Sequence, residues 1–288
     1  MEAMFYTKLA NEAVQCQLCP HRCKIQPGRH GICRMRANLH GTLESLNWGR
    51  IVSIAFDPIE KKPLYHFHPG TRILSLGSLG CNLRCFFCQN YEISQALPES
   101  CTRLPIYHPE SFIPLAKKEP DNIGIAFTYN EPTVWYEFML ETAMLAQQNN
   151  LKTVMVTNGY INPEPLAQLL PFMDAFNVDL KAFTDEFYRK HTGSTLAPVL
   201  ETLKQIRAAG KHLEITTLVI PTLNDDPVVF AKQIDWLADE LGPDTILHLS
   251  RYFPHYRCTI EQTPRKTLDQ LQEIAMKRLR HVHLGNVW

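Results

Sequence analysis

The hydrophobic residues from about position 71 onward form short apolar runs, separated by longer segments in which they recur every three or four positions. Runs of this length are typical of buried strands, and the longer segments have the periodicity of amphipathic helices. The expected strands are 73–79, 123–127, 153–156, 175–178, 213–219 and 245–249, with 281–284 as a candidate for one more. The expected helices are 132–149, 163–170, 197–209 and 227–241, and proline stands near several of their starts, as helix N-termini prefer.

Repeated strand–helix units predict parallel strands joined by right-handed crossovers. Six such units favour an α/β fold in the form of a partial (β/α)6, TIM-like barrel rather than a closed eightfold one. The first 40 residues differ, because they are rich in cysteine and have Gly28 and Gly31 as turn residues. The stretch 42–54 alternates well enough for a hairpin or two short strands. We therefore expect a small N-terminal Cys-rich module with a connector over 1–70 and a barrel over 71–288.

Composition narrows the class of protein. The chain has 288 residues, 45% of them hydrophobic, which suffices for one large core. The formal net charge is zero, and residues 1–70 carry nine Lys and Arg against five Asp and Glu. This excess is too small to indicate nucleic-acid binding.

The chain also lacks the sequence features of membrane and secreted proteins. No apolar run reaches the roughly eighteen residues of a membrane span, and the first fifteen residues have no signal-peptide core. We therefore expect a cytoplasmic protein without a membrane partner. Nine cysteines in such a chain favour metal or redox chemistry over disulfides.

Three of the cysteines, Cys81, Cys85 and Cys88, follow the first expected barrel strand in a C-x3-C-x2-C arrangement. Three thiolates this close can hold three corners of a cuboidal iron–sulfur cluster, and no fourth cysteine lies in the local loop. One iron would then keep an open position, which is the arrangement of catalytic rather than structural metal sites. The alternatives are a zinc site, a disulfide framework or three buried thiols.

Polar residues follow the other expected strands, at the edge where barrel enzymes carry their active sites. An amino acid that chelates an open iron needs a carboxylate for its ammonium group and a cation for its carboxylate. Glu131 or Asp179, together with Lys181, can supply both, although an ordinary ion pair between strand ends is the alternative. The weaker candidates for hydrogen bonds to ribose or amide groups are Asn130, Thr157 and Asn158, and Asn-Gly is also an ordinary turn.

Several blocks of sequence resemble the radical SAM (S-adenosylmethionine) enzymes of the AmmeMemoRadiSam system. The blocks are Cys19–Ile25, Asp57–Leu64, Tyr129–Thr133, Val156–Tyr160, Val178–Lys181 and Leu218–Pro221. The stretch from Gly70 to Cys85 is also similar to activating enzymes of glycyl-radical enzymes, such as pyruvate formate-lyase activating enzyme. The resemblance covers nearly the whole chain.

This resemblance implies a 4Fe–4S cluster on Cys81, Cys85 and Cys88, with SAM on the unique iron. One electron from an external flavodoxin- or ferredoxin-like reductant would cleave SAM to methionine and a 5′-deoxyadenosyl radical. The radical would abstract hydrogen from a protein, peptide or small molecule, with a glycyl-radical enzyme as the particular case suggested by the local motif. No general acid or base is required for the first step.

The resemblance also implies which residues contact SAM. Phe87 is the aromatic residue that precedes the third cysteine, Glu131 holds the methionine ammonium, and Asp179 and Lys181 form a strand-end pair. Family members often have a histidine after the position of Phe253, which is absent here. His248 is a substitute candidate, with a packed core histidine as the alternative.

A second group of cysteines, Cys16, Cys19, Cys23 and Cys33, lies near the N-terminus and is called the quartet below. Four thiolates can close a tetrahedral zinc site or fully ligate an auxiliary iron–sulfur cluster, and His21 can replace one of them. Both assignments remain open.

Other residues have no assigned chemistry. The segment 57–64 with Lys61 and Lys62, followed by His66 and His68, is either a solvated connector or a loop that contacts substrate or partner. The two isolated cysteines, Cys101 and Cys258, are expected to be buried or surface thiols, with a catalytic hydrogen donor as the alternative.

An electron-transfer or zinc-stabilised binding protein with purely structural cysteines is the alternative from another class. The sequence disfavours it, because an open three-cysteine site would have no role there.

Overall fold

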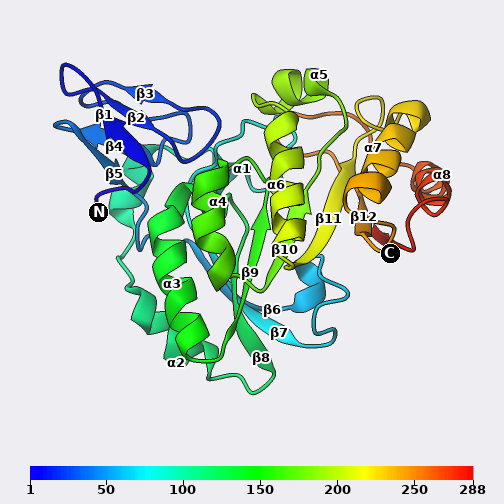
Figure 1. The fold of residues 1–288 in the computed structure, drawn as a ribbon, viewed down its shortest axis with the longest axis horizontal. Coiled ribbons are helices and arrows are strands. Elements are labelled where there is room, and N and C mark those ends of the chain that lie inside the picture. Colours follow the sequence, from blue (N-terminus) through cyan, green and yellow to red (C-terminus); the bar gives the residue numbers. More distant parts are fainter. Residues whose placement is uncertain (288) are drawn as a thin grey trace.

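The structure is a computed structural model that describes residues 1–287 (Figure 1). Within this part of the chain the main body is an eight-stranded sheet whose strands follow one another in chain order. The strands are β6 (Ser53–Pro58), β7 (Arg72–Gly77), β8 (Asn122–Phe127), β9 (Lys152–Thr157), β10 (Ala175–Asp179), β11 (His212–Val219), β12 (Ile246–Arg251) and β13 (His281–Gly285). From β7 to β13 each strand is parallel to the next, whereas β6 pairs antiparallel with β7 at one edge.

Helices connect the parallel strands, and α3, α4, α6 and α7 stand in a row in front of the sheet (Figure 1). The helices are α1 (Tyr91–Ser94), α2 (Phe112–Ala116), α3 (Tyr136–Gln148), α4 (Pro163–Leu169), α5 (Asp185–Phe187), α6 (Ala197–Ala208), α7 (Pro227–Glu240) and α8 (Arg265–Ala275). Proline occupies the first turn of α4, α6 and α7. Asp226 caps α7 by accepting the backbone N–H groups of Val228 and Val229, both at 2.9 Å.

The N-terminal residues form a separate β-rich module, drawn in blue in Figure 1. One small antiparallel sheet contains β1 (Tyr6–Lys8), β2 (Val14–Cys16) and β3 (Lys24–Ile25), and β4 (Arg36–Leu39) pairs with β5 (Thr42–Ser45). A buried ion pair of 2.9 Å between Arg36 and Glu137 of α3 joins the module to the barrel. Removing one partner of such a pair is strongly destabilising, because the other charge stays buried.

The predicted α/β fold is confirmed, and the parallel strands and most long helices lie within about two residues of their expected ends. The exception is the expected helix 132–149, whose first four residues form a 3-10 helix before α3. The candidate strand 281–284 is part of β13. The stretch 42–54 does not form one hairpin, because β5 pairs with β4 and β6, which begins at Ser53, pairs with β7. The β6 residues before position 70 are therefore hydrogen-bonded to the barrel sheet, and a domain boundary at 70 stays a prediction.

Residues 59–71, which we call the plug, lie at the end of the barrel where the parallel strands begin. Ile59, Leu64 and Phe67 pack against residues at or near the strand starts, such as Ile73 and Ala175. The backbone N–H groups of Tyr65 and His66 donate to the carboxylate of Glu214 on β11, at 2.9 and 2.8 Å. The solvated-connector alternative for this segment is therefore wrong.

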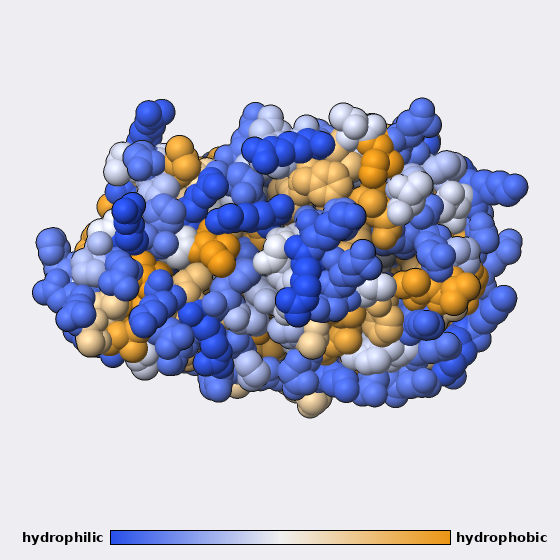
Figure 2. All heavy atoms as spheres, turned by 90° about the horizontal axis from the view of Figure 1, so that it is seen from above, coloured by the Kyte–Doolittle hydropathy of each residue, from blue (hydrophilic) through white to orange (hydrophobic). Residues whose placement is uncertain are grey.

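Hydrophilic residues dominate the face shown in Figure 2, and the hydrophobic ones form separate patches between them. None of the helices among residues 1–287 combines the length and the apolar composition that a membrane crossing requires.

Candidate active site

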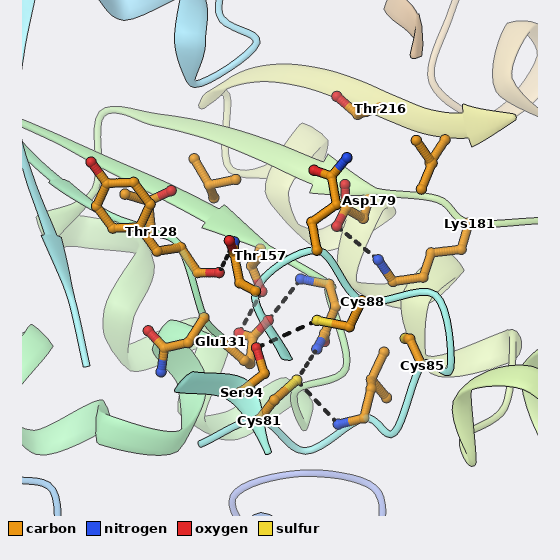
Figure 3. Close-up of a pocket in the computed structure, with 18 of the residues that line it drawn as sticks. Cys81, Cys85, Cys88, Ser94, Thr128, Glu131, Thr157, Asp179, Lys181 and Thr216 are labelled. Atoms are coloured by element: carbon orange, nitrogen blue, oxygen red, sulfur yellow. Dashed lines mark hydrogen bonds and ion pairs between the residues drawn. The ribbon is translucent and has the colours of Figure 1, made fainter. Parts of the chain in front are cut away.

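A cavity of about 330 Å³ lies at the carboxyl ends of the parallel strands (Figure 3). The predicted residues that line it are Cys81, Cys85, Phe87, Cys88, Asn130, Glu131, Thr157, Asn158, Asp179 and Lys181. The cysteines and Phe87 come from the loop after β7, and the others follow β8, β9 and β10 or end those strands. The structure thus brings together in one cavity all but one of the residues predicted for the triplet and SAM.

The cysteine loop surrounds its sulfur atoms with hydrogen-bond donors. The backbone N–H of Leu83 lies 3.3 Å from Cys81 Sγ, and the side-chain amide of Asn158 lies 3.6 Å from the same atom. The Cys88 thiol donates to the Ser94 hydroxyl oxygen at 3.6 Å. Three soft sulfur ligands in one loop, with two donors directed at Cys81, suit an iron–sulfur cluster, so the residues present fit that group.

Burial and a neighbouring positive charge shift the pKa of the Cys85 thiol in opposite directions. Burial raises the pKa of the Cys85 thiol to about 12, while the ammonium group of Lys181 opposes this rise. A metal centre that binds the thiolate would remove the penalty, because coordination deprotonates the thiol.

Glu131 is buried and its carboxylate accepts four hydrogen bonds. Oε1 accepts from the backbone N–H and the hydroxyl of Thr133, at 3.0 and 2.7 Å, and from the Thr157 hydroxyl at 2.7 Å. Oε2 accepts only the backbone N–H of Asn158, at 2.8 Å. Burial raises the pKa of Glu131 and these hydrogen bonds counteract the rise. A carboxylate oxygen has two lone pairs, so Oε2 keeps capacity for another donor.

Asn130 and Asn158 hold the cysteine loop in place. The Asn130 side chain accepts the N–H of Ser78 and donates to the carbonyl of Gly80, at 3.0 and 2.9 Å. The Asn158 side chain donates to Asn82 Oδ1 at 2.9 Å and contacts Cys81. Both side chains therefore position the loop, while their roles toward SAM stay predictions.

Asp179 and Lys181 form an ion pair of 2.8 Å beside Cys85 (Figure 3). Burial alone would lower the pKa of Lys181, but the charges of Asp179 and Cys85 raise it overall. Lys181 therefore remains cationic in the cavity. An ion pair between strand-end residues and a contact to the cofactor are both compatible with this arrangement.

His248 does not line the cavity. Its Nε2 lies 2.6 Å from Glu214 Oε2, and its ring stacks on His283 with 5.3 Å between the centroids. These contacts match the alternative interpretation, in which His248 is a packed core histidine. Two residues further along β12, Ser250 lines the cavity instead, because a strand directs every second side chain to the same face.

Sequence reasoning missed a polar group on the cavity wall. Lys62 Nζ and Tyr129 Oη both donate to Asp57 Oδ2, at 2.7 and 2.6 Å. Lys62 and Tyr129 line the cavity, and Tyr129 has a positive φ of 72°. Asp57 lies only five residues before Lys62, but it is 72 residues from Tyr129, and the pairing of β6 with β7 and of β7 with β8 brings these two together.

The four quartet cysteines line a second, smaller cavity together with His21 and Asn82. Burial raises the pKa of Cys33 to about 11. Among residues 1–287 no three His, Cys, Asp or Glu side chains are arranged to hold a single metal ion. The metal of the quartet stays a prediction.

The two isolated cysteines, Cys101 and Cys258, lie outside both cysteine sites. Both are buried, and Cys101 Sγ lies 3.5 Å from Met35 Sδ.

Residues 76–233, more than half of the chain, match the family model of the radical SAM superfamily. The chain therefore belongs to the radical SAM superfamily, which uses a 4Fe–4S cluster and SAM. It is an enzyme of the radical SAM type.

Individual relatives extend this assignment. An uncharacterised protein of Methanocaldococcus jannaschii is 44% identical over 99% of this chain and 85% of its own length. The (2S)-3-sulfopropanediol dehydratase activating enzyme of Klebsiella oxytoca is 24% identical over 41% of this chain and 38% of its own. A solved domain of pyruvate-formate lyase-activating enzyme from Bacteroides vulgatus shares the fold, with a TM-score of 0.51 at 16% identity over 57% of this chain and 99% of that domain.

Proposed function

We propose that this enzyme reductively cleaves SAM at a 4Fe–4S cluster held by Cys81, Cys85 and Cys88. The observation that carries this function is the shared cavity, in which three thiols face Glu131 and the Asp179–Lys181 ion pair. When bound, the cluster supplies the electron that breaks the sulfonium, which yields methionine and a 5′-deoxyadenosyl radical. The protein's part is orientation and a site protected from water.

The residues around the cysteines have separate tasks in this proposal. Oε2 of Glu131 accepts the methionine ammonium with its remaining lone pair, while Oε1 fixes the end of β9 through Thr157. Lys181 offers its charge to the methionine carboxylate and is kept in place by Asp179. Phe87 covers the cluster side of the cavity with its buried ring.

The substrate that we propose is a protein or peptide of the AmmeMemoRadiSam system, from which the radical abstracts a hydrogen atom. The sequence blocks quoted above support this choice, and the names of the activating-enzyme relatives make a glycyl-radical enzyme a specific candidate. The reaction also needs an external one-electron reductant in the cytoplasm.

An anaerobic assay tests the cleavage. We expect the reconstituted protein with dithionite and SAM to release 5′-deoxyadenosine, measured by chromatography. Cys85→Ala should abolish the release, whereas Cys258→Ala, which removes a buried thiol outside both cysteine sites, should retain it. No 5′-deoxyadenosine from the wild type, or equal amounts from Cys85→Ala, would contradict the proposed function.

A second assay addresses the substrate. A candidate protein is incubated anaerobically with enzyme, reductant and SAM, and its mass and its electron paramagnetic resonance (EPR) spectrum are recorded. A mass shift or a radical signal that depends on Cys85 identifies it as a substrate.

A further inference from the structure

The quartet and the cysteine triplet share a spacing that points to similar centres. Cys16, Cys19 and Cys23 span eight residues in a C-x2-C-x3-C order, and Cys81, Cys85 and Cys88 span eight residues in the reverse order. The quartet adds Cys33, and its four thiols line one cavity. In each site a segment of eight residues thus supplies three possible cluster ligands, and only the quartet adds a fourth.

The two cysteine sites touch on both sides of Cys81. Asn82, which follows Cys81, lines the quartet cavity, and its carbonyl accepts the Nε2–H of His21 at 2.8 Å. Gly80, which precedes Cys81, packs so tightly that an added Cβ would lie 3.0 Å from the carbonyl oxygen of Cys33. One short chain of covalent and hydrogen bonds, through His21 and Asn82, therefore connects the quartet with the first ligand of the open site. On the other side of Cys81, Gly80 and Cys33 are in close packing contact.

The arrangement of the quartet favours a cluster over a zinc ion. The sulfurs of a tetrahedral Zn(Cys)4 site lie within about 4 Å of one another, because each Zn–S bond is about 2.3 Å. The described residues hold no such single-ion arrangement, in the quartet or in the triplet, for which the family uses a cluster. His21 is not needed as a ligand, since the four cysteines complete the set, and its Nε2 is hydrogen-bonded to the Asn82 carbonyl.

We propose that Cys16, Cys19, Cys23 and Cys33 hold a second iron–sulfur cluster, which passes electrons to the open site through the His21–Asn82 contact. This inference rests on the proposed function. An external one-electron carrier is oxidised and the quartet centre is reduced. The same electron then moves to the open centre, where the C–S bond of the SAM sulfonium accepts it and breaks into methionine and the 5′-deoxyadenosyl radical.

The surface around the quartet suits an acidic electron carrier. Arg22 and Lys24 flank Cys23, Arg29 lies four residues before Cys33, and all three cations are exposed. Three of the four quartet cysteines, Cys19, Cys23 and Cys33, are themselves partly exposed. A basic rim speeds the encounter with an acidic partner, and salt weakens this effect.

Metal analysis tests the second cluster without reference to activity. The full chain is reconstituted anaerobically, and iron, zinc and sulfide are measured. We expect about eight irons in the wild type and in Cys258→Ser, and about four in Cys33→Ser. About four irons and one zinc in the wild type, with only zinc lost from Cys33→Ser, would overturn the proposal.

A triple variant keeps the test valid if Cys33→Ser misfolds. It combines Cys81→Ser, Cys85→Ser and Cys88→Ser, and it leaves the quartet intact. This protein should keep about four irons, and its reduced EPR signal should not change when SAM is added. An iron-free protein would overturn the second cluster.

The electron path is tested by comparing two reductants. With a flavodoxin-type carrier, SAM cleavage should fall about tenfold or more in Cys33→Ser and in His21→Phe, which removes the hydrogen bond to Asn82. With dithionite, which can reduce the open centre directly, cleavage should fall much less. His21→Gln keeps a donor and should restore carrier-driven cleavage. An equal fall with both reductants would overturn the relay.

Charge reversal on the rim tests the docking surface. Lys24→Glu should raise the carrier concentration needed for half-maximal rate about tenfold at low salt, and less at high salt. Lys118→Glu, an exposed change just before β8 at the opposite end of the barrel, is the control. Equal effects would exclude this surface. If the wild type releases no 5′-deoxyadenosine even with dithionite, the proposed function fails, while the metal counts still decide the second cluster.

Discussion

Glu131→Gln separates the two tasks that we assign to this carboxylate. Glutamine keeps the shape of glutamate, but an amide NH2 group replaces one of its oxygens. The amide oxygen fits best at the Oε1 position, because three donors converge there. The NH2 group then faces the backbone N–H of Asn158, which lies 2.8 Å from Oε2 in the wild type. Two donors would meet, and the acceptor proposed for the SAM ammonium would be lost.

The expected magnitudes follow from these contacts. A buried donor without a partner costs about 1–3 kcal/mol, and loss of the buried charge offsets part of this cost, since burial raises the pKa of Glu131. We therefore expect a fall in Tm of about 2–6 °C for a chain of this size. Loss of a charge-assisted hydrogen bond, worth about 1.5–3 kcal/mol, should weaken SAM binding about 10–150-fold.

Thermal unfolding and equilibrium SAM binding of the reconstituted protein measure both effects. Glu141→Gln is the matched control, because Glu141 lies on α3 and accepts a 3.3 Å hydrogen bond from Trp48 outside the cavity. It should leave SAM affinity unchanged. If Glu131→Gln lowers Tm but binds SAM like the wild type, the carboxylate only positions β9, and its role as acceptor of the ammonium is refuted.

Other perturbations test other parts of the site. Lys181→Met leaves Asp179 without its 2.8 Å partner and should weaken SAM binding about tenfold or more, measured by equilibrium titration. Burial favours a higher pKa for Glu214, but hydrogen bonds from two histidines and from the plug lower it from 4.5 to about 2. Glu214→Gln should therefore destabilise the protein by about 3 kcal/mol at pH 7, and this difference in urea unfolding should shrink as the pH falls from 4.5 toward 2. Gly80→Ala adds a Cβ at a φ of 92° that would overlap the quartet loop, and should cost about 2–4 kcal/mol of unfolding free energy, against about 1 for Gly70→Ala, where the space is open.

Sequence reasoning located the cavity residues because strand ends can be read from a pattern. In a parallel barrel the carboxyl ends of all strands meet at one edge, so a polar residue that follows an apolar run is placed without knowledge of side-chain contacts. Glu131, Asp179 and Lys181 were found in this way. The same rule explains why His248 does not line the cavity, since it lies within its strand and therefore at a different depth of the barrel.

The partners of these residues could not be predicted, because they come from distant parts of the chain. Glu214 lies within the expected strand 213–219, and the local sequence shows no partner for its charge. The backbone N–H groups of Tyr65 and His66, which donate to it, are 149 and 148 residues away. Asp57 meets Tyr129 across 72 residues. Such contacts depend on how β6 and the plug pack against the rest of the barrel, which no local sequence pattern encodes.

The direction of β6 determines where the quartet lies. β6 runs antiparallel to β7, so Ser53 at its start pairs with Gly77 at the end of β7, four residues before Cys81. The module that precedes β6 must therefore lie at the active end of the barrel. A parallel β6 would have placed the module beside the plug, at the opposite end. A module that only stabilised the fold could lie at either end, whereas an electron relay requires the one that is observed.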